Sequence, residues 1–83
     1  MKRPSRPKKK LNITGDVIRR LRVAASPKIS QEDMVGRVAR LGLQLSQPQV
    51  ALIEAGKRML RDFEVLAFAK ALKVPVQALY EVK

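Results

Sequence analysis

The sequence contains no cysteine and no histidine. Without cysteine, the protein can form neither a disulfide nor a thiolate metal site. Without histidine, it lacks the commonest general base, the imidazole metal ligand and the usual switch near neutral pH. We therefore expect that the protein is not an enzyme and that it uses no metal and no cofactor.

Other features are scarce rather than missing. The seven acidic residues are scattered, so no paired carboxylates for hydrolysis are expected. The three aromatic residues, Phe63, Phe68 and Tyr80, lie on apolar faces of predicted helices and suggest no stacking platform for RNA bases. No apolar run approaches the roughly twenty residues of a membrane span. The basic N-terminus lacks the apolar core of a signal peptide. We expect a cytoplasmic protein, associated with the nucleoid and not with a membrane.

Positive charge is abundant. The chain of 83 residues has 18 Lys and Arg against seven acids, for a formal net charge of +11. This length indicates a single domain with a modest core. A charge so far from balance favours an anionic partner, of which nucleic acid is the commonest.

Residues 1–10 form a predicted basic tail. Like charges repel and prolines interrupt helices, so we expect this segment to be disordered in the free protein. Two interpretations stay open: an arm that follows phosphates or enters a minor groove, or a tail for solubility or import. The cations of this basic arm are Lys2, Arg3, Arg6, Lys8, Lys9 and Lys10.

Residues 11–83 are predicted to form a compact all-α domain of five helices. The helical periodicity and the breaks place these helices at 15–25, from 30 to a stop at Gly42, at 46–55, from 62 to the break at Val74-Pro75, and at 76–80. Thr14 and Asp62 are the expected N-caps of the first and fourth helices. In the second helix, Leu41 is expected to face inward together with Met34, Val35 and Val38.

The segment 46–58 is the most informative part of the chain. Ser46 and Gln49 have the spacing of a capping box. Gly56 can take the left-handed conformation that ends a helix, and Lys57-Arg58 follows at once. A helix with a polar first turn, an apolar inner face and a cationic exit is typical of one that lies in a DNA groove.

Five short motifs follow one another in a recognisable order: Ile18-Arg19-Arg20-Leu21-Arg22, Ile29-Ser30-Gln31-Glu32-Asp33-Met34, Val50 to Arg58, Ala69-Lys70-Ala71-Leu72-Lys73-Val74, and Leu79-Tyr80. Together they resemble the helix-turn-helix domain of phage repressors and Cro proteins, also called the xenobiotic-response-element family. The resemblance covers residues 13–80. It implies a lambda-repressor-like fold in which helix 46–55 enters the major groove.

The resemblance also implies roles for individual residues. It implies base contacts from Gln47, Gln49 and Leu52. It implies phosphate contacts from Gln31, Ser46, Lys57 and Arg58. It implies a structural ion pair between Arg22 and Glu54. Other interpretations stay open: the two glutamines of helix 46–55 can serve as capping residues, Leu52 can serve in packing, and the two cations can be ordinary solvated charges.

The chain departs from the family pattern in the segment between Ser30 and Glu54. This segment is longer than usual, which indicates a longer turn before helix 46–55. Ala51 and Leu52 are apolar where relatives often carry polar residues. Leu52 can meet a thymine methyl group but cannot form a bidentate bond to a purine. Direct readout of bases would therefore depend mainly on Gln47 and Gln49.

These observations predict a sequence-specific DNA-binding transcriptional regulator, in the first place a repressor that occupies an operator. Double-stranded DNA is the expected partner, and a homodimer on two half-sites is the expectation from the family. Candidate dimer surfaces include Leu43, Leu45, Leu60 and the last helix. The alternative is a protein-interaction module on the same fold, such as an antitoxin bound to its toxin or a coactivator-like domain.

Overall fold

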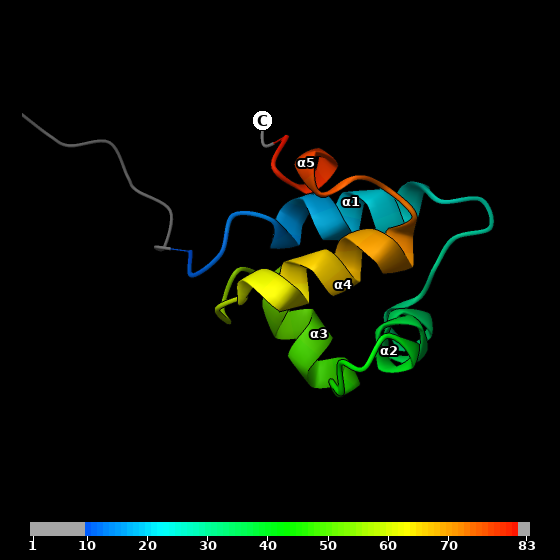
Figure 1. Ribbon diagram of the computed structural model, residues 1–83, viewed down its shortest axis with the longest axis horizontal. Helices are drawn as coiled ribbons and strands as arrows, with labels where there is room; N and C mark the ends of the chain where they lie inside the picture. Colours follow the sequence, from blue (N-terminus) through cyan, green and yellow to red (C-terminus); the bar gives the residue numbers. More distant parts are fainter. Residues whose placement is uncertain (1–9, 82–83) are drawn as a thin grey trace, which may run out of the picture.

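The computed structural model describes residues 10–81, and the remaining residues, 1–9 and 82–83, are outside this description. The described residues form five α-helices and no strand, so the predicted all-α class is confirmed (Figure 1). The helices are α1 (Gly15–Ala24), α2 (Gln31–Arg40), α3 (Gln47–Glu54), α4 (Asp62–Leu72) and α5 (Val76–Leu79).

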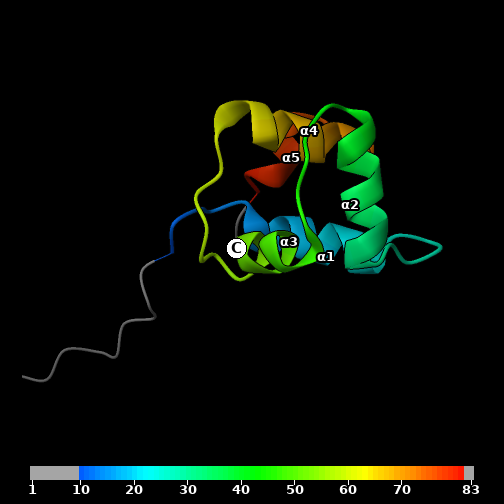
Figure 2. The same ribbon diagram turned by 90° about the horizontal axis from the view of Figure 1, so that it is seen from below.

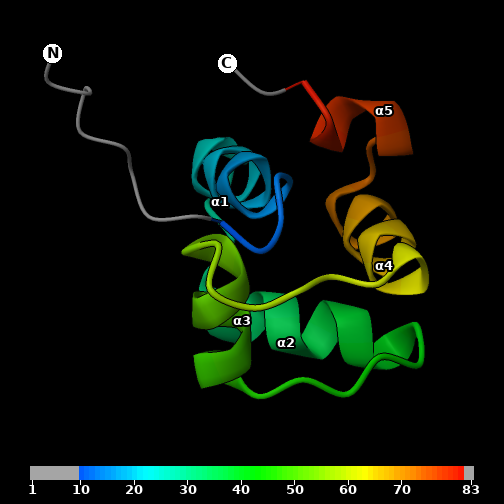
Figure 3. The ribbon, with the colours of Figure 1, turned by 90° about the vertical axis from the view of Figure 1, so that its left-hand side faces the viewer.

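The core lies where α1, α2, α3 and α4 meet (Figure 3). Helix α3 packs against α1 and α2, while α4 packs against α1, α2 and α5. Phe68 of α4 is completely buried at the centre of this arrangement. Its largest fully buried neighbours in the core are Ile18, Met34, Ile53 and Leu79. Helix α5 lies at the end of the molecule opposite α2 and α3 (Figures 1 and 3).

Helices α2 and α3 both begin with a capping box. In α3, the Ser46 hydroxyl accepts the Gln49 N–H, and the Gln49 side chain accepts the Ser46 N–H, as the sequence predicted. In α2, Ser30 and Asp33 exchange the same two bonds. The N–H of Ser30, helped by the Ser30 hydroxyl, lowers the pKa of the Asp33 carboxyl below its ordinary value. Both helices therefore start at a defined residue.

The loop 41–46 joins α2 to α3. Gly42 has a φ of +91° and ends α2, as predicted. Leu41 lies beyond the last helical turn and is 46% exposed, so the prediction that it faces inward was wrong. Leu45 is only 8% exposed because it inserts into the core, so it cannot be a dimer surface. The buried Leu45 anchors the loop and holds the start of α3 against the domain.

The predicted cap of α4 was wrong, and that of α1 was right in position only. Arg61 is the N-cap of α4, and its N–H is accepted by the Glu64 carboxylate at 3.0 Å, while Asp62 is the first helical residue. Thr14 is the N-cap residue of α1, as predicted, but it has helical backbone angles and its side chain forms no capping hydrogen bond. Asn12 replaces it by accepting the Gly15 N–H at 2.7 Å.

Asn12 also joins the start of α1 to the end of α3. Its amide nitrogen donates to the carbonyl oxygens of Ile53, at 3.1 Å, and Arg58, at 2.7 Å. This clamp brings α1 so close that a Cβ atom on Gly15 would lie 2.0 Å from the Ile53 oxygen. Glycine is therefore required at position 15 by the close approach of two helices.

We predict that Gly15→Ala destabilises the protein by about 1–3 kcal/mol, because the methyl group must push α1 away from the α3 backbone. Gly36→Ala is the matched control. Gly36 is exposed in the middle of α2, and a Cβ atom there would meet nothing within 4 Å. The free energy of unfolding of this control should rise by about 0.4–1 kcal/mol, because alanine reduces the backbone entropy of the unfolded chain. Urea denaturation of the three proteins measures both effects, and equal shifts in the two variants would contradict the proposed close approach.

Candidate nucleic-acid interface

A buried ion pair joins α1 to α3. The Arg22 guanidinium donates to the Glu54 carboxylate through Nε at 2.7 Å and Nη2 at 2.8 Å. Their side chains are only 9% and 2% exposed. The third nitrogen, Nη1, donates to the Ile29 carbonyl oxygen at 2.8 Å. The bonds to Glu54 raise the pKa of Arg22 above its ordinary value, although burial acts in the opposite direction.

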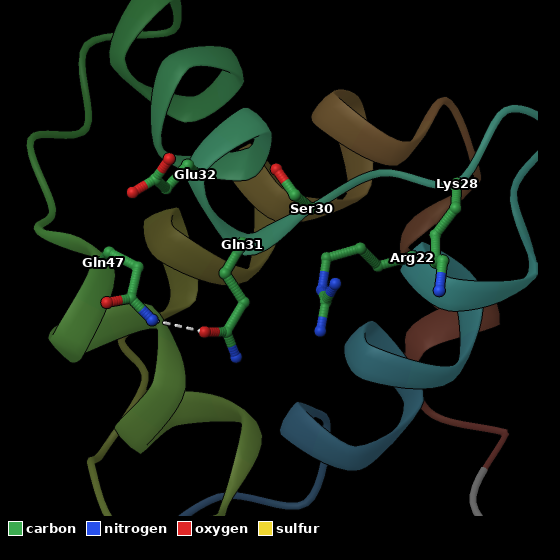
Figure 4. A pocket seen from close by; sticks show the side chains of 6 residues that line it. All are labelled: Arg22, Lys28, Ser30, Gln31, Glu32 and Gln47. Atoms are coloured by element: carbon green, nitrogen blue, oxygen red, sulfur yellow. Dashed lines mark hydrogen bonds between the residues drawn. The ribbon is translucent and has the colours of Figure 1, made fainter.

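Two glutamines extend this pair to the surface. Gln31, the first residue of α2, donates its Nε2 to Glu54 Oε1 at 3.0 Å. Gln47, the first residue of α3, donates its own Nε2 to Gln31 Oε1 (Figure 4). Hydrogen bonds therefore run without interruption from a buried charge to an exposed side chain in the first turn of α3.

This chain of bonds determines how both amides are turned. A carboxylate can only accept, so Gln31 must present its NH₂ group to Glu54 and its oxygen to Gln47. Gln47 must then present its NH₂ group to Gln31. One N–H and the carbonyl oxygen of Gln47 remain available, which is the donor–acceptor pair that an adenine edge requires.

A shallow depression of about 540 Å³ lies beside the two glutamines (Figure 4). Lys28, in the loop between α1 and α2, lines it on the side opposite Gln47. Arg22, the other cation that lines the depression, is paired with Glu54, whereas Lys28 has no ion-pair partner among residues 10–81. Sequence reasoning did not single out Lys28, since the motif does not include the loop before Ser30.

The other predicted base contacts are arranged differently. Gln49 uses its side-chain oxygen to accept from the N–H and hydroxyl of Ser46, at 2.9 and 3.3 Å. A bidentate bond from Gln49 to a base would therefore have to break the cap of α3. Ser46, a predicted phosphate contact, is engaged in the same box. Leu52 is 44% exposed on the outer side of α3 and takes no part in the core.

The two cations after α3 also differ from each other. Lys57 is exposed. Arg58, the other predicted phosphate contact, forms a bidentate ion pair with Glu64 of α4, at 3.2 and 3.3 Å. Glu64 is almost completely buried, so Arg58 joins the exit of α3 to α4. Sequence reasoning missed this pair because the partners become neighbours only after the chain turns between the two helices.

Lys10 and Leu11, which follow the other cations of the predicted basic arm, lie beside the exit of α3. Leu11 donates its N–H to the Gly56 carbonyl oxygen at 2.8 Å. Lys10, which is exposed, has its aliphatic carbons next to the Cα atom of Gly56, where the φ is +77°. The remaining predicted arm residues, Lys2, Arg3, Arg6, Lys8 and Lys9, lie outside the described residues.

Comparisons of this chain with protein-family models, with curated proteins and with solved structures found no match. Function must therefore be argued from the site itself. Within residues 10–81, no group of three or more acidic side chains is placed to hold a metal ion. No helix in this range is long and apolar enough to cross a membrane.

We predict that Arg22→Ala and Glu54→Ala each lower the free energy of unfolding by about 3–5 kcal/mol, because either change leaves a buried charge without its partner. The double variant should lose much less than the sum. Asp16 and Arg20 are a matched control pair, since they are 53% and 44% exposed and 4.0 Å apart. Their coupling should be at most about 0.5 kcal/mol. Double-mutant cycles from urea denaturation measure both couplings, and additive losses at Arg22 and Glu54 would disprove the buried pair.

We predict that Glu64 makes the stability of the protein depend on acidity. Burial raises the pKa of Glu64, but the bonds from Arg58 and the Arg61 N–H outweigh it, and the net pKa is lowered. The stabilisation is therefore complete above the ordinary value of 4.5 and is lost as the pH falls through the lower folded pKa.

The variant Glu64→Gln tests this dependence. It should be less stable than wild type by about 1–3 kcal/mol at neutral pH, because the charged hydrogen bonds to Arg58 are lost. The difference should shrink as the pH is lowered from about 6 to about 3, because protonation removes the same charge from the wild type. Urea denaturation across this range gives the answer. A difference that stays constant with pH would contradict the proposed role of the charge.

Proposed function

We propose that this protein is a sequence-specific DNA-binding regulator of the helix-turn-helix type, with α3 in the major groove and Gln47 as its principal reading residue. The hydrogen-bonded chain from Arg22 through Glu54 and Gln31 to Gln47 carries this proposal. It holds an exposed amide at the first turn of a helix, where base-reading residues of such motifs lie. Preorganised recognition groups lose little entropy on binding.

The charges around α3 support the same orientation on DNA. Lys28 lies at the depression beside the start of α3, and Lys57 follows its end. Lys10 is beside Gly56 and leads into the basic arm. Cations at both ends of a reading helix suit phosphate contacts on the two sides of a groove. Arg58 contributes less to this surface than the sequence suggested, because Glu64 neutralises it.

The fold proposed for this function is the lambda-repressor-like five-helix arrangement. Regulation would come from occupancy: the protein covers an operator and blocks polymerase. One domain reads only a few base pairs, so two copies on a pair of half-sites would supply the specificity. The operator would then carry the same two-fold symmetry as the protein dimer.

The role of Gln47 can be tested with DNA selected from a random duplex library. Wild-type protein should select a defined sequence, with an adenine at the position that Gln47 meets. Gln47→Ala should lose about 1–3 kcal/mol of binding free energy on this sequence, and its affinity for unrelated duplex DNA should not change. Gln77→Ala is the matched control, because this glutamine is exposed on α5 at the opposite end of the molecule. If Gln47→Ala keeps the wild-type ratio of affinities for the selected and the unrelated duplex, α3 does not read the bases.

Lys57→Ala should act differently from Gln47→Ala. A phosphate contact carries no sequence information, so this variant should weaken selected and unrelated duplexes equally. It should also reduce the slope of log affinity against log salt by about one unit. Titrations of both duplexes over a range of salt concentrations measure this slope. If Lys57→Ala changes sequence preference while leaving the slope unaltered, Lys57 is not a phosphate contact.

A further inference from the structure

A second surface lies away from α3, where the C-terminal end of α2 meets α4. We refer to this surface, made by residues 37–43 and 63–73, as the α2–α4 corner. Three of the nine exposed large apolar side chains among residues 10–81 lie there: Leu41 at 46%, Phe63 at 55% and Leu66 at 44%. They line a groove of about 230 Å³. Contiguous apolar patches on protein surfaces are typical of interaction sites.

Positive charge borders the apolar groove directly. A neighbouring depression of about 320 Å³ shares Leu41 and Lys70 with the groove and is lined in addition by Arg37, Arg40, Ala71 and Lys73. Arg37 already has partners within the domain, since its guanidinium donates to the Ala71 carbonyl oxygen at 3.0 Å and faces the Asp33 carboxylate. Arg40, Lys70 and Lys73 are exposed, and none of them has an ion-pair partner among residues 10–81.

The position of the corner separates it from the proposed DNA interface. In Figures 2 and 3, the C-terminal end of α2 and helix α4 lie on one side of the molecule, while α1 and α3 lie on the other. Cations at the C-terminal ends of α2 and α4 also suit the helix dipoles. The dipoles, however, give no reason for three apolar side chains to be exposed beside these cations.

We propose that the α2–α4 corner binds an acidic, amphipathic segment of a partner protein. The apolar residues of this segment would fill the groove at Leu41, Phe63 and Leu66. Its carboxylates would pair with Arg40, Lys70 and Lys73. A short helix with apolar residues three and four positions apart presents both properties on one face. The protein would then bind DNA with one surface and a regulatory partner with another.

Charge decides between the kinds of occupant. In a two-fold dimer the same patch meets itself, so a second copy would bring the unpaired cations of the two corners together. Like charges at an interface oppose association. Nucleic acid would satisfy the cations, but a phosphate backbone offers nothing to the three apolar side chains. An acidic segment with apolar residues complements both parts of the surface.

The probe for this proposal is a displayed library of random peptides about fifteen residues long, enough for about four helical turns. It is selected on the full-length protein in the absence of DNA. We expect enriched peptides to be acidic, with apolar residues at helical spacing. Phe63→Ala should weaken their binding by more than about tenfold, as for a central aromatic anchor. The double charge reversal Lys70→Glu/Lys73→Glu should also weaken it by at least about tenfold, in a salt-dependent manner.

Two matched controls test the location. Met59→Ala removes an apolar side chain that is 67% exposed outside the corner, and Arg19→Glu reverses an exposed cation on α1. Neither should change peptide binding. Phe63→Ala should leave DNA affinity unchanged, so failure of this proposal is distinct from failure of the proposed DNA-binding function.

Several outcomes would overturn the assignment. The proposal of an acidic partner would be wrong if no peptides are enriched, or if the enriched peptides lack acidic residues. It would also be wrong if the peptides bind Phe63→Ala as well as they bind the wild type. A wild-type dimer that dissociates on Phe63→Ala in sedimentation experiments would assign the corner to a second copy. A loss of DNA affinity in Lys70→Glu/Lys73→Glu, with peptide binding unaffected, would assign it to nucleic acid.

Discussion

The arrangement of the domain depends on the buried carboxylate of Glu54. It accepts hydrogen bonds from Arg22 of α1 and Gln31 of α2, while Glu54 itself ends α3. A buried charge is tolerated only when its hydrogen-bonding capacity is filled, so these three helices cannot shift independently without a large cost. The pair is therefore better understood as a device that sets the relative positions of the helices than as a source of net stability.

The same carboxylate organises the surface chemistry. An acceptor in the interior determines the orientation of the Gln31 amide, and this amide determines the orientation of Gln47. The rigid contact between α1 and α3 at Gly15, together with the Asn12 clamp, keeps the other end of α3 in place. A helix of only eight residues can be positioned precisely in this setting, because both of its ends are held by groups outside it.

Local signals explain most of the agreement between sequence and structure. Helix starts and stops depend on residues close in the chain, which is why the Ser46–Gln49 capping box and the Gly42 stop were predictable. The sequence did not reveal that Leu41 lies at the surface and Leu45 in the core, because apolar periodicity does not show the residue at which a helix ends. The Arg58–Glu64 pair and the bonds from Asn12 to the Ile53 and Arg58 carbonyl oxygens were also missed, since they join segments that meet only after folding. The bond from the Gly15 N–H to Asn12 spans three residues, and it was missed although it is local.

The sequence by itself determined the all-α class, the order of the helices and the strongly basic character, because these follow from periodicity, capping residues and composition. Through family resemblance, it also indicated the partners Arg22 and Glu54, which the structure brings into contact. Only the tertiary structure decided that Gln47 is joined through Gln31 to the buried Glu54, and that Arg58 is paired while Lys57 is exposed. The physical reason is that hydrogen-bonding capacity is limited: whether a polar side chain remains available to a ligand depends on which neighbours the fold has already given it.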